Sequence, residues 1–228
     1  MSIDSGVGSI FVGGRIRGRA SGSRAEEGAG VGGDLDLFAS DDVHLDAPVD
    51  LHGSAPDGEG GSVVVEAGGN VIQSAPLIAS TRGDSRAGFV SMRAGRDLVL
   101  GSVDLRGEAG GGQIEAYANG TATIGGLLRA DGDPRRGTSG AVLVQACGVE
   151  VAAGGGVSTV GTPGAGVLFV TLLRAGASMT IAGTLVSGGE NRLEYGAATP
   201  SILSGAEVTP PPVLIPGSSL GCAAQTPA

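Results

Sequence analysis

Apolar and polar residues alternate in short runs along most of the chain. The runs follow the pattern Gly-x-apolar-x-apolar-x-Ala/Gly, as in residues 33–39 (GDLDLFA) and 61–67 (GSVVVEA). Alternation with a period of two places every second side chain on one face of a β-strand. No stretch has the i, i+3, i+4, i+7 spacing of an amphipathic helix. The pattern therefore predicts an all-β protein.

The alternating runs recur at a regular interval. They begin at Gly8, Gly33, Gly61, Gly88, Gly112, Gly140, Gly166 and Gly189, which are 23 to 28 residues apart. Each unit has room for three short strands, and in the unit from Gly88 we expect them at residues 90–92, 98–100 and 103–105. Three strands and three turns make one coil of a parallel β-helix, whose inward face is buried only by stacking on its neighbours. An antiparallel β-sandwich also has short alternating strands, but the three-strand period favours the β-helix.

Two rows of inward side chains are expected to form the core. Both rows are almost wholly aliphatic, as a narrow cylindrical core requires. The first row is predicted to contain Ile10, Leu35, Val63, Val90, Ile114, Val142 and Leu168, and the second Val12, Leu37, Val65, Met92, Ala116, Val144 and Val170.

With these repeats, residues 5–195 resemble the right-handed parallel β-helix proteins, and specifically the repeats of filamentous-haemagglutinin-like and autotransporter-passenger adhesins. The resemblance implies a right-handed solenoid, here of about eight coils over residues 1–195, and an adhesive or structural role. Its motifs are periodic and degenerate, so it indicates a fold more than a function.

The last 33 residues lose the repeat. Residues 196–228 include three consecutive prolines at 210–212, which favour an extended chain. The outward positions Val64, Phe89, Leu143, Val167 and Phe169 are apolar, so we expect this Pro-rich tail to fold back and pack on that flank of the helix. A disulfide between Cys147 and Cys222 would hold the tail there, and two separate thiols are the alternative.

The composition narrows the classes of partner. The chain has 228 residues, 45 of them glycine, a formal net charge of −9 and no lysine. Such an acidic chain lacks the basic surface that nucleic-acid binding needs. No apolar run is long enough for a transmembrane helix, and no signal peptide is evident. We expect self-association or a cell-surface or polysaccharide ligand, outside the cell or on its surface.

Both histidines lie in an acidic part of the second coil. Asp42, His44 and Asp46 alternate with inward residues and should share one outward face. They are candidate metal ligands, for Ca²⁺ or Zn²⁺, although the coil otherwise requires no cofactor. The alternative is that they keep an exposed sheet soluble.

A second candidate site is the sequence Arg82-Gly83-Asp84-Ser85 in a predicted loop. It matches the integrin-recognition motif, so Arg82, Gly83 and Asp84 are candidate binding residues. A solvated turn is the alternative reading.

No catalytic residue stands out, and the main prediction is a non-catalytic extracellular or cell-surface module, structural or adhesive, that can assemble into fibres. The alternative is a carbohydrate-active enzyme, a polysaccharide lyase or hydrolase of β-helix fold, using the acidic cluster of the second coil. Against the enzyme, Arg93, Arg96 and Arg106 show no acidic partner set on neighbouring coils.

Overall fold

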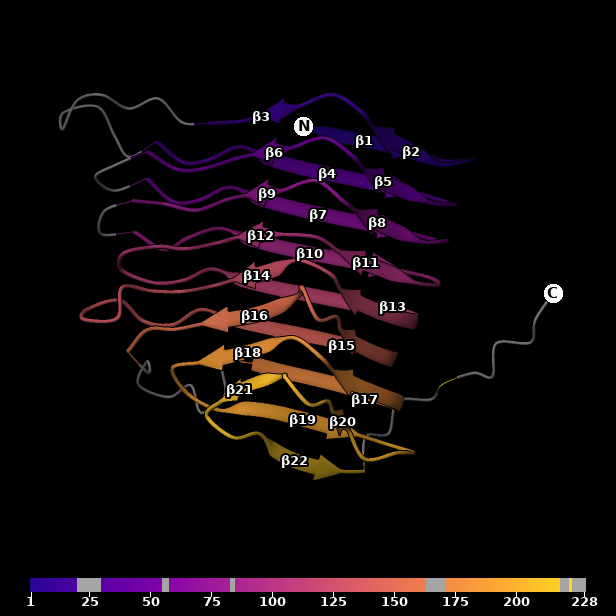
Figure 1. The fold of residues 1–228 in the computed structure, drawn as a ribbon. Helices are drawn as coiled ribbons and strands as arrows, with labels where there is room; N and C mark the ends of the chain where they lie inside the picture. The colour runs from indigo at the N-terminus through magenta and orange to yellow at the C-terminus, as the bar shows by residue number, and fades with distance from the viewer. Residues whose placement is uncertain (20–29, 55–57, 83–84, 163–170, 218–221, 223–228) are drawn as a thin grey trace.

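The chain folds into a parallel β-solenoid, seen in a computed structural model that describes residues 1–19, 30–54, 58–82, 85–162, 171–217 and 222. Figure 1 shows strands of successive coils stacked above one another, with β1 and β22 at opposite ends of the stack. The described residues contain no helix, and all pairings between their strands are parallel. The predicted all-β, parallel β-helix fold is therefore confirmed.

The strands form three ladders along the stack. The first ladder contains β1 (Ser2–Ser5), β4 (Asp34–Ala39), β7 (Ser62–Ala67), β10 (Phe89–Ala94), β13 (Gln113–Ile124), β15 (Ala141–Val151), β17 (Thr171–Ile181), β19 (Asn191–Tyr195) and β22 (Val213–Pro216). The second contains β2 (Ile10–Val12), β5 (Val43–Leu45), β8 (Val71–Gln73), β11 (Leu98–Leu100), the later parts of β13, β15 and β17, and β20 (Ser201–Ile202). The third contains β3 (Ile16–Arg17), β6 (Val49–Asp50), β9 (Leu77–Ile78), β12 (Val103–Asp104), β14 (Leu127–Arg129), β16 (Gly156–Thr159), β18 (Thr184–Ser187) and β21 (Glu207–Thr209).

The core lies between the ladders and is mainly aliphatic. Its first-ladder rows match the prediction from β4 to β15, where each predicted side chain is almost completely buried: Leu35, Val63, Val90, Ile114 and Val142 in one row, and Leu37, Val65, Met92, Ala116 and Val144 in the other. A two-residue period is reliable here because each inward side chain packs between like side chains of the coils on either side.

Steric crowding between coils explains why the repeats open with glycine. Gly33, Gly61, Gly88, Gly112 and Gly140 stack in a column, and a Cβ atom on any of the last four would collide with the backbone carbonyl oxygen of the glycine before it in the column. The coils therefore approach one another too closely at this corner for any side chain. This close approach explains why the repeat was detectable from its glycines.

Two parts of the predicted core rows were wrong. Ile10 and Val12 belong to β2 and pair with β5 of the second ladder, while Ile3 of β1 extends the first ladder. The first repeat was therefore aligned on the wrong strand. Both strands alternate apolar and polar residues, so the pattern alone did not distinguish them.

The other error lies beyond β15. Thr171 pairs with Val142 and Leu173 with Val144, in the places predicted for Leu168 and Val170. Residues 163–170 lie outside the described residues, and with them the predicted outward Val167 and Phe169. The buried threonine breaks the aliphatic pattern, which is why the sequence pointed to an earlier, more apolar segment.

The tail prediction also requires correction. Residues 196–217 do not fold back on a flank, because β20, β21 and β22 pair in parallel with β17, β18 and β19 and continue the stack. Proline has the extended φ of a strand or an extended corner, so the prolines at 210–212 fit between β21 and β22 without ending the solenoid.

Candidate functional site

Polar side chains gather on the outer face of the third ladder. Backbone hydrogen bonds continue that ladder past β6, β9 and β12 and align one residue from each of four coils. The aligned residues are His52, Ser80, Arg106 and Asp131. Neighbouring strands are about 4.8 Å apart, so these side chains form a row along the solenoid axis.

A buried carboxylate lies beside the N-terminal end of this row. The Asp50 side chain is 1% exposed, although it stands at an outward position of β6. Its Oδ2 accepts hydrogen bonds from Arg19, with Nε at 2.8 Å and Nη2 also in contact, and Arg15 Nη2 lies 3.5 Å away. On the other side, Nδ1 of His52 lies 2.8 Å from Oδ1. Two arginines and a histidine therefore cover the carboxylate.

These neighbours determine the charge state of Asp50. Burial raises its pKa, but the hydrogen bonds from Arg19 and His52, together with their charges, outweigh burial and hold the pKa at about 2, below the usual 3.8. The hydrogen bond with Asp50 also raises the pKa of Arg19. Asp50 is therefore ionised except in strong acid, and it positions cations rather than exchanging protons.

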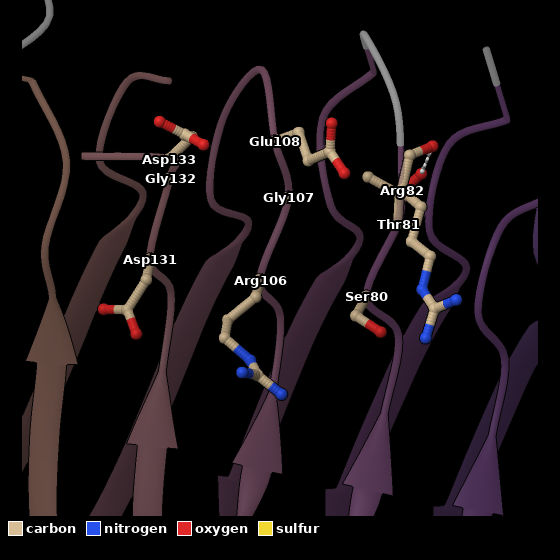
Figure 2. A pocket seen from close by; sticks show the side chains of 9 residues that line it. All are labelled: Ser80, Thr81, Arg82, Arg106, Gly107, Glu108, Asp131, Gly132 and Asp133. Atoms are coloured by element: carbon tan, nitrogen blue, oxygen red, sulfur yellow. Dashed lines mark hydrogen bonds between the residues drawn. The ribbon is translucent and has the colours of Figure 1, made fainter. Parts of the chain in front are cut away.

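Next to this cluster, three neighbouring strand ends line an open groove of about 350 Å³ (Figure 2). Each end contributes three consecutive residues: Ser80, Thr81 and Arg82; Arg106, Gly107 and Glu108; and Asp131, Gly132 and Asp133. Both signs of charge line the groove, with the carboxylates concentrated toward the later coils.

The aligned charges of the groove already have partners. Arg106 donates two hydrogen bonds to Asp104, at 2.9 and 2.6 Å. Asp131 Oδ1 accepts from the Ser158 hydroxyl at 2.6 Å and from the Val160 amide at 2.8 Å. Burial raises the pKa of Asp104, but the hydrogen bonds from Arg106 outweigh it and lower that pKa overall. These groups form fixed pairs, which can bind polar ligands but do not supply a free acid and base.

The expectation that Arg93 lacks an acidic partner on a neighbouring coil was wrong, and Arg106 has an acidic partner in its own coil. Arg106 pairs with Asp104 within its own coil, and Arg93 Nε lies 3.9 Å from Glu66 of the preceding coil. Arg93 also lies over the ring of Tyr117, with 4.7 Å from its guanidinium carbon to the ring centroid. The i, i+2 spacing of Asp104 and Arg106 was the signal in the sequence for the first pair.

The structure does not bring the candidate metal ligands together. Asp42 Oδ1 accepts hydrogen bonds from the backbone and side chain of Asn70. Asp46 Oδ1 accepts from Ser74, and the His44 ring stacks on Phe11 at 4.6 Å. Among the described residues no three such side chains could hold a metal ion. Asp42, His44 and Asp46 each contact a different neighbour and make no joint site.

The candidate integrin motif falls mostly outside the described residues. Arg82 is described and exposed in the groove, whereas Gly83 and Asp84 are not described. The two cysteines, by contrast, are described and bonded: Cys147 of β15 is joined to Cys222, with the Cα atoms 5.4 Å apart.

Sequence reasoning missed the role of Asp50. An outward aspartate in a strand is usually exposed, so the alternating pattern gave no sign that Asp50 is buried. The available signal was the alternation of Arg15, Arg17 and Arg19 one coil earlier, which faces Asp50 once Arg17 is aligned with it.

Comparison of the chain with protein-family models, curated proteins and solved structures finds no match. Within the described ranges, the structure has no helix long and apolar enough to cross a membrane.

Proposed function

We propose that the chain is a non-catalytic structural and adhesive module that works outside the cell and presents the outer face of its third ladder on a rigid rod. The observation that carries this proposal is the row of His52, Ser80, Arg106 and Asp131, aligned by the backbone ladder. A fixed row of polar groups suits repeated contacts with an elongated partner, because the groups need no reordering on binding.

The disulfide supports a location outside the cytoplasm. Such bonds persist mainly in secreted and cell-surface proteins, because the cytoplasm keeps thiols reduced. The bond between Cys147 and Cys222 closes a separation of 75 residues and connects the end of the stack to β15. The resemblance to filamentous-haemagglutinin-like and autotransporter adhesins supports the same location and role.

The strand edges support self-association. In the described part of the chain β22 pairs only with β19, and Val213 and Leu214 in it are each 42% exposed. Leu214 continues a core row through its pairing with Leu193, so its exposure leaves part of the core uncovered. An open strand edge with apolar side chains recruits other strands. We expect contacts between rods at this end.

An attachment assay tests the function. Beads coated with the full chain are exposed to neutral and acidic polysaccharides and to cell-surface proteins, and bound material is measured after washing. The proposal predicts attachment to at least one class. Loss of attachment after unfolding in urea is the matched control, and attachment to none of the classes would contradict an adhesive role.

Light scattering and negative-stain electron microscopy test self-association. We expect rods joined end to end, and fewer joined rods when Leu214→Asp places a charge on the exposed end. Monomeric rods at all concentrations would contradict this part of the proposal.

The mixed charges of the groove favour a second candidate, a carbohydrate-active enzyme. Acidic and basic groups in one groove are what polysaccharide cleavage uses. Yet the Asp131 carboxylate is occupied by Ser158 and Val160, and Glu108 pairs with Arg136 at 2.7 Å. These partners favour binding over proton transfer.

A further inference from the structure

Arginine side chains gather on the outer face of the third ladder in the first coils, although the chain has a net charge of −9. Arg15, Arg17 and Arg19 lie beside the buried carboxylate of Asp50, and Arg82 follows the third-ladder strand two coils later. Glu59 is an exposed carboxylate in a neighbouring loop. This cluster of guanidinium groups in an acidic chain makes the face a candidate surface for an anionic partner.

Asp50 fixes part of this cluster without consuming its donors. The side chains of Arg15 and Arg19 remain 44% and 47% exposed while they contact Asp50. A guanidinium has five N–H donors, so each retains donors directed at solvent. Arg17 and Arg82 are exposed and form no ion pair with any described residue. The cluster therefore offers several unused cationic donors, two of which one buried anion holds in place.

The cluster continues along the axis into the polar row. His52, which contacts Asp50, is the first residue of this row. It lies beside Ser80, and Ser80 lies beside Arg106, so hydrogen-bond donors recur once per coil. The coils are about 4.8 Å apart, which is close to the length of one sugar ring along a polysaccharide. The carboxylates of Glu108, Asp131 and Asp133 lie at the later coils of the groove and would repel an anion there. The favourable stretch therefore ends near Arg106.

We infer that the first three coils bind an acidic polysaccharide, whose sulfate or carboxylate groups contact Arg15, Arg17, Arg19 and Arg82 while the chain lies along the solenoid axis. This inference rests on the proposed adhesive function and names its ligand. Charge-assisted hydrogen bonds from guanidinium groups are the strongest contacts available to such anions. The ligand follows from the placement of the arginines, because Arg82 lies two coils from Arg17 along the axis and one compact anion would not reach both.

Equilibrium binding of the full chain to three polymers tests the inference. Dextran sulfate and polygalacturonate present the two anions, and neutral dextran is the control polymer. We expect binding of at least one polyanion, weakening as salt rises, and no binding of neutral dextran. Absence of binding to both polyanions at low salt would overturn the inference.

Two matched variants locate the site. Arg15→Gln with Arg17→Gln should weaken polyanion binding about tenfold or more, the effect of losing charge-assisted hydrogen bonds. Arg96→Gln with Arg135→Gln changes the net charge equally at exposed positions on other coils, and should weaken binding less than about twofold. Equal weakening by both pairs would mean attraction by net charge alone and would overturn the site. Unchanged thermal unfolding of both pairs excludes a folding defect.

Asp50→Asn separates positioning from charge. It makes the cluster more positive but removes the group that holds Arg19 and His52. We expect weaker binding, and stronger binding would overturn the positioning role of Asp50.

Inorganic sulfate should compete poorly with dextran sulfate when both supply the same concentration of sulfate groups. Equal competition would overturn the polysaccharide as the ligand, because the site would then bind free anions equally well. Attachment of beads to a neutral glycan or protein, without polyanion binding, would overturn this inference but leave the adhesive function standing.

Discussion

The same core row of the first ladder is aliphatic in its middle coils and polar in its last ones. Val63 and Val90 occupy the row in β7 and β10, whereas Thr171 and Asn191 occupy it in β17 and β19, and all four are completely buried. The Thr171 hydroxyl lies 3.0 Å from that of Thr159, and the Asn191 amide donates to the Pro210 carbonyl at 3.0 Å. The early coils are joined by apolar contact, and the late coils also by specific hydrogen bonds.

This difference shows two ways of filling one position in a solenoid. An aliphatic side chain packs against any neighbour of suitable size, so identical coils can be repeated. A buried hydroxyl or amide is tolerated only with its partner, and it therefore specifies which segment lies beside it. The last coils, where the prolines at 210–212 interrupt the repeat, are where such specification occurs.

The largest expected effect comes from placing a polar side chain in the aliphatic part of the core row. Val90→Asn puts an amide in the aliphatic row without a partner, and we expect it to lower the free energy of unfolding by about 3–4 kcal/mol. Urea unfolding followed by circular dichroism measures the loss. Val99→Asn, at a side chain that is 38% exposed, is the control and should cost less than about 1 kcal/mol. Equal losses would show that the middle core tolerates polar groups.

The disulfide should matter most for the polar coils. Cys147→Ser with Cys222→Ser removes the covalent connection of the chain end to β15, and we expect stability to fall by up to about 2–4 kcal/mol. Hydrogen exchange should show lost protection in β21 and β22 and retained protection in β7 and β10. Reductant should have no further effect on the double variant. Two free thiols in the unreduced wild-type protein, found by alkylation and mass spectrometry, would contradict the bond itself.

A double-mutant cycle sharpens the comparison at one contact. Thr159→Val or Thr171→Val alone leaves the other hydroxyl buried without its partner, and each should cost about 1–3 kcal/mol. Both changes together make the contact aliphatic, as in the middle coils, and should cost less than either one. Additive losses would mean that the two hydroxyls are not paired.

The smallest effect is expected on the outer face. Asp50→Asn should lower stability by about 1–2 kcal/mol near neutral pH, because the arginine partners are partly exposed and solvent replaces part of their contacts. The pKa of Asp50 is about 2 in the folded protein, below the usual 3.8. Its stabilisation is therefore complete above pH 4 or so and is lost as the pH falls through about 2. Unfolding curves of both proteins should converge over that range, and a constant difference would contradict the ion pairs.

The comparison also explains how far the sequence predicted the fold. The alternation located Val63, Val90 and their row because aliphatic side chains and the stacked glycines repeat together. It failed at Thr171, whose burial depends on a partner twelve residues earlier that no period reveals. The tail was misassigned for a different reason. Its strands β20 to β22 are only two to four residues long, too short for the alternation to be recognised, and their place in the stack is seen only in their pairing with the previous coil.

The candidate site was less predictable than the fold. Asp42, His44 and Asp46 were singled out because they are close in sequence, but their partners Asn70, Phe11 and Ser74 come from neighbouring coils. Asp50 acquires its neighbours in the same way. In a solenoid, side chains meet mainly across coils, about one repeat apart, and short motifs miss those contacts.

The non-catalytic role is the central claim, and a cleavage assay tests it most directly. Wild-type protein and Asp131→Asn are incubated with neutral and acidic polysaccharides, and new reducing ends and unsaturated sugars are measured against a protein-free blank. We predict that neither protein releases products above the blank while the wild type still binds. Turnover by the wild type that disappears in Asp131→Asn would contradict the account and make the groove an active site.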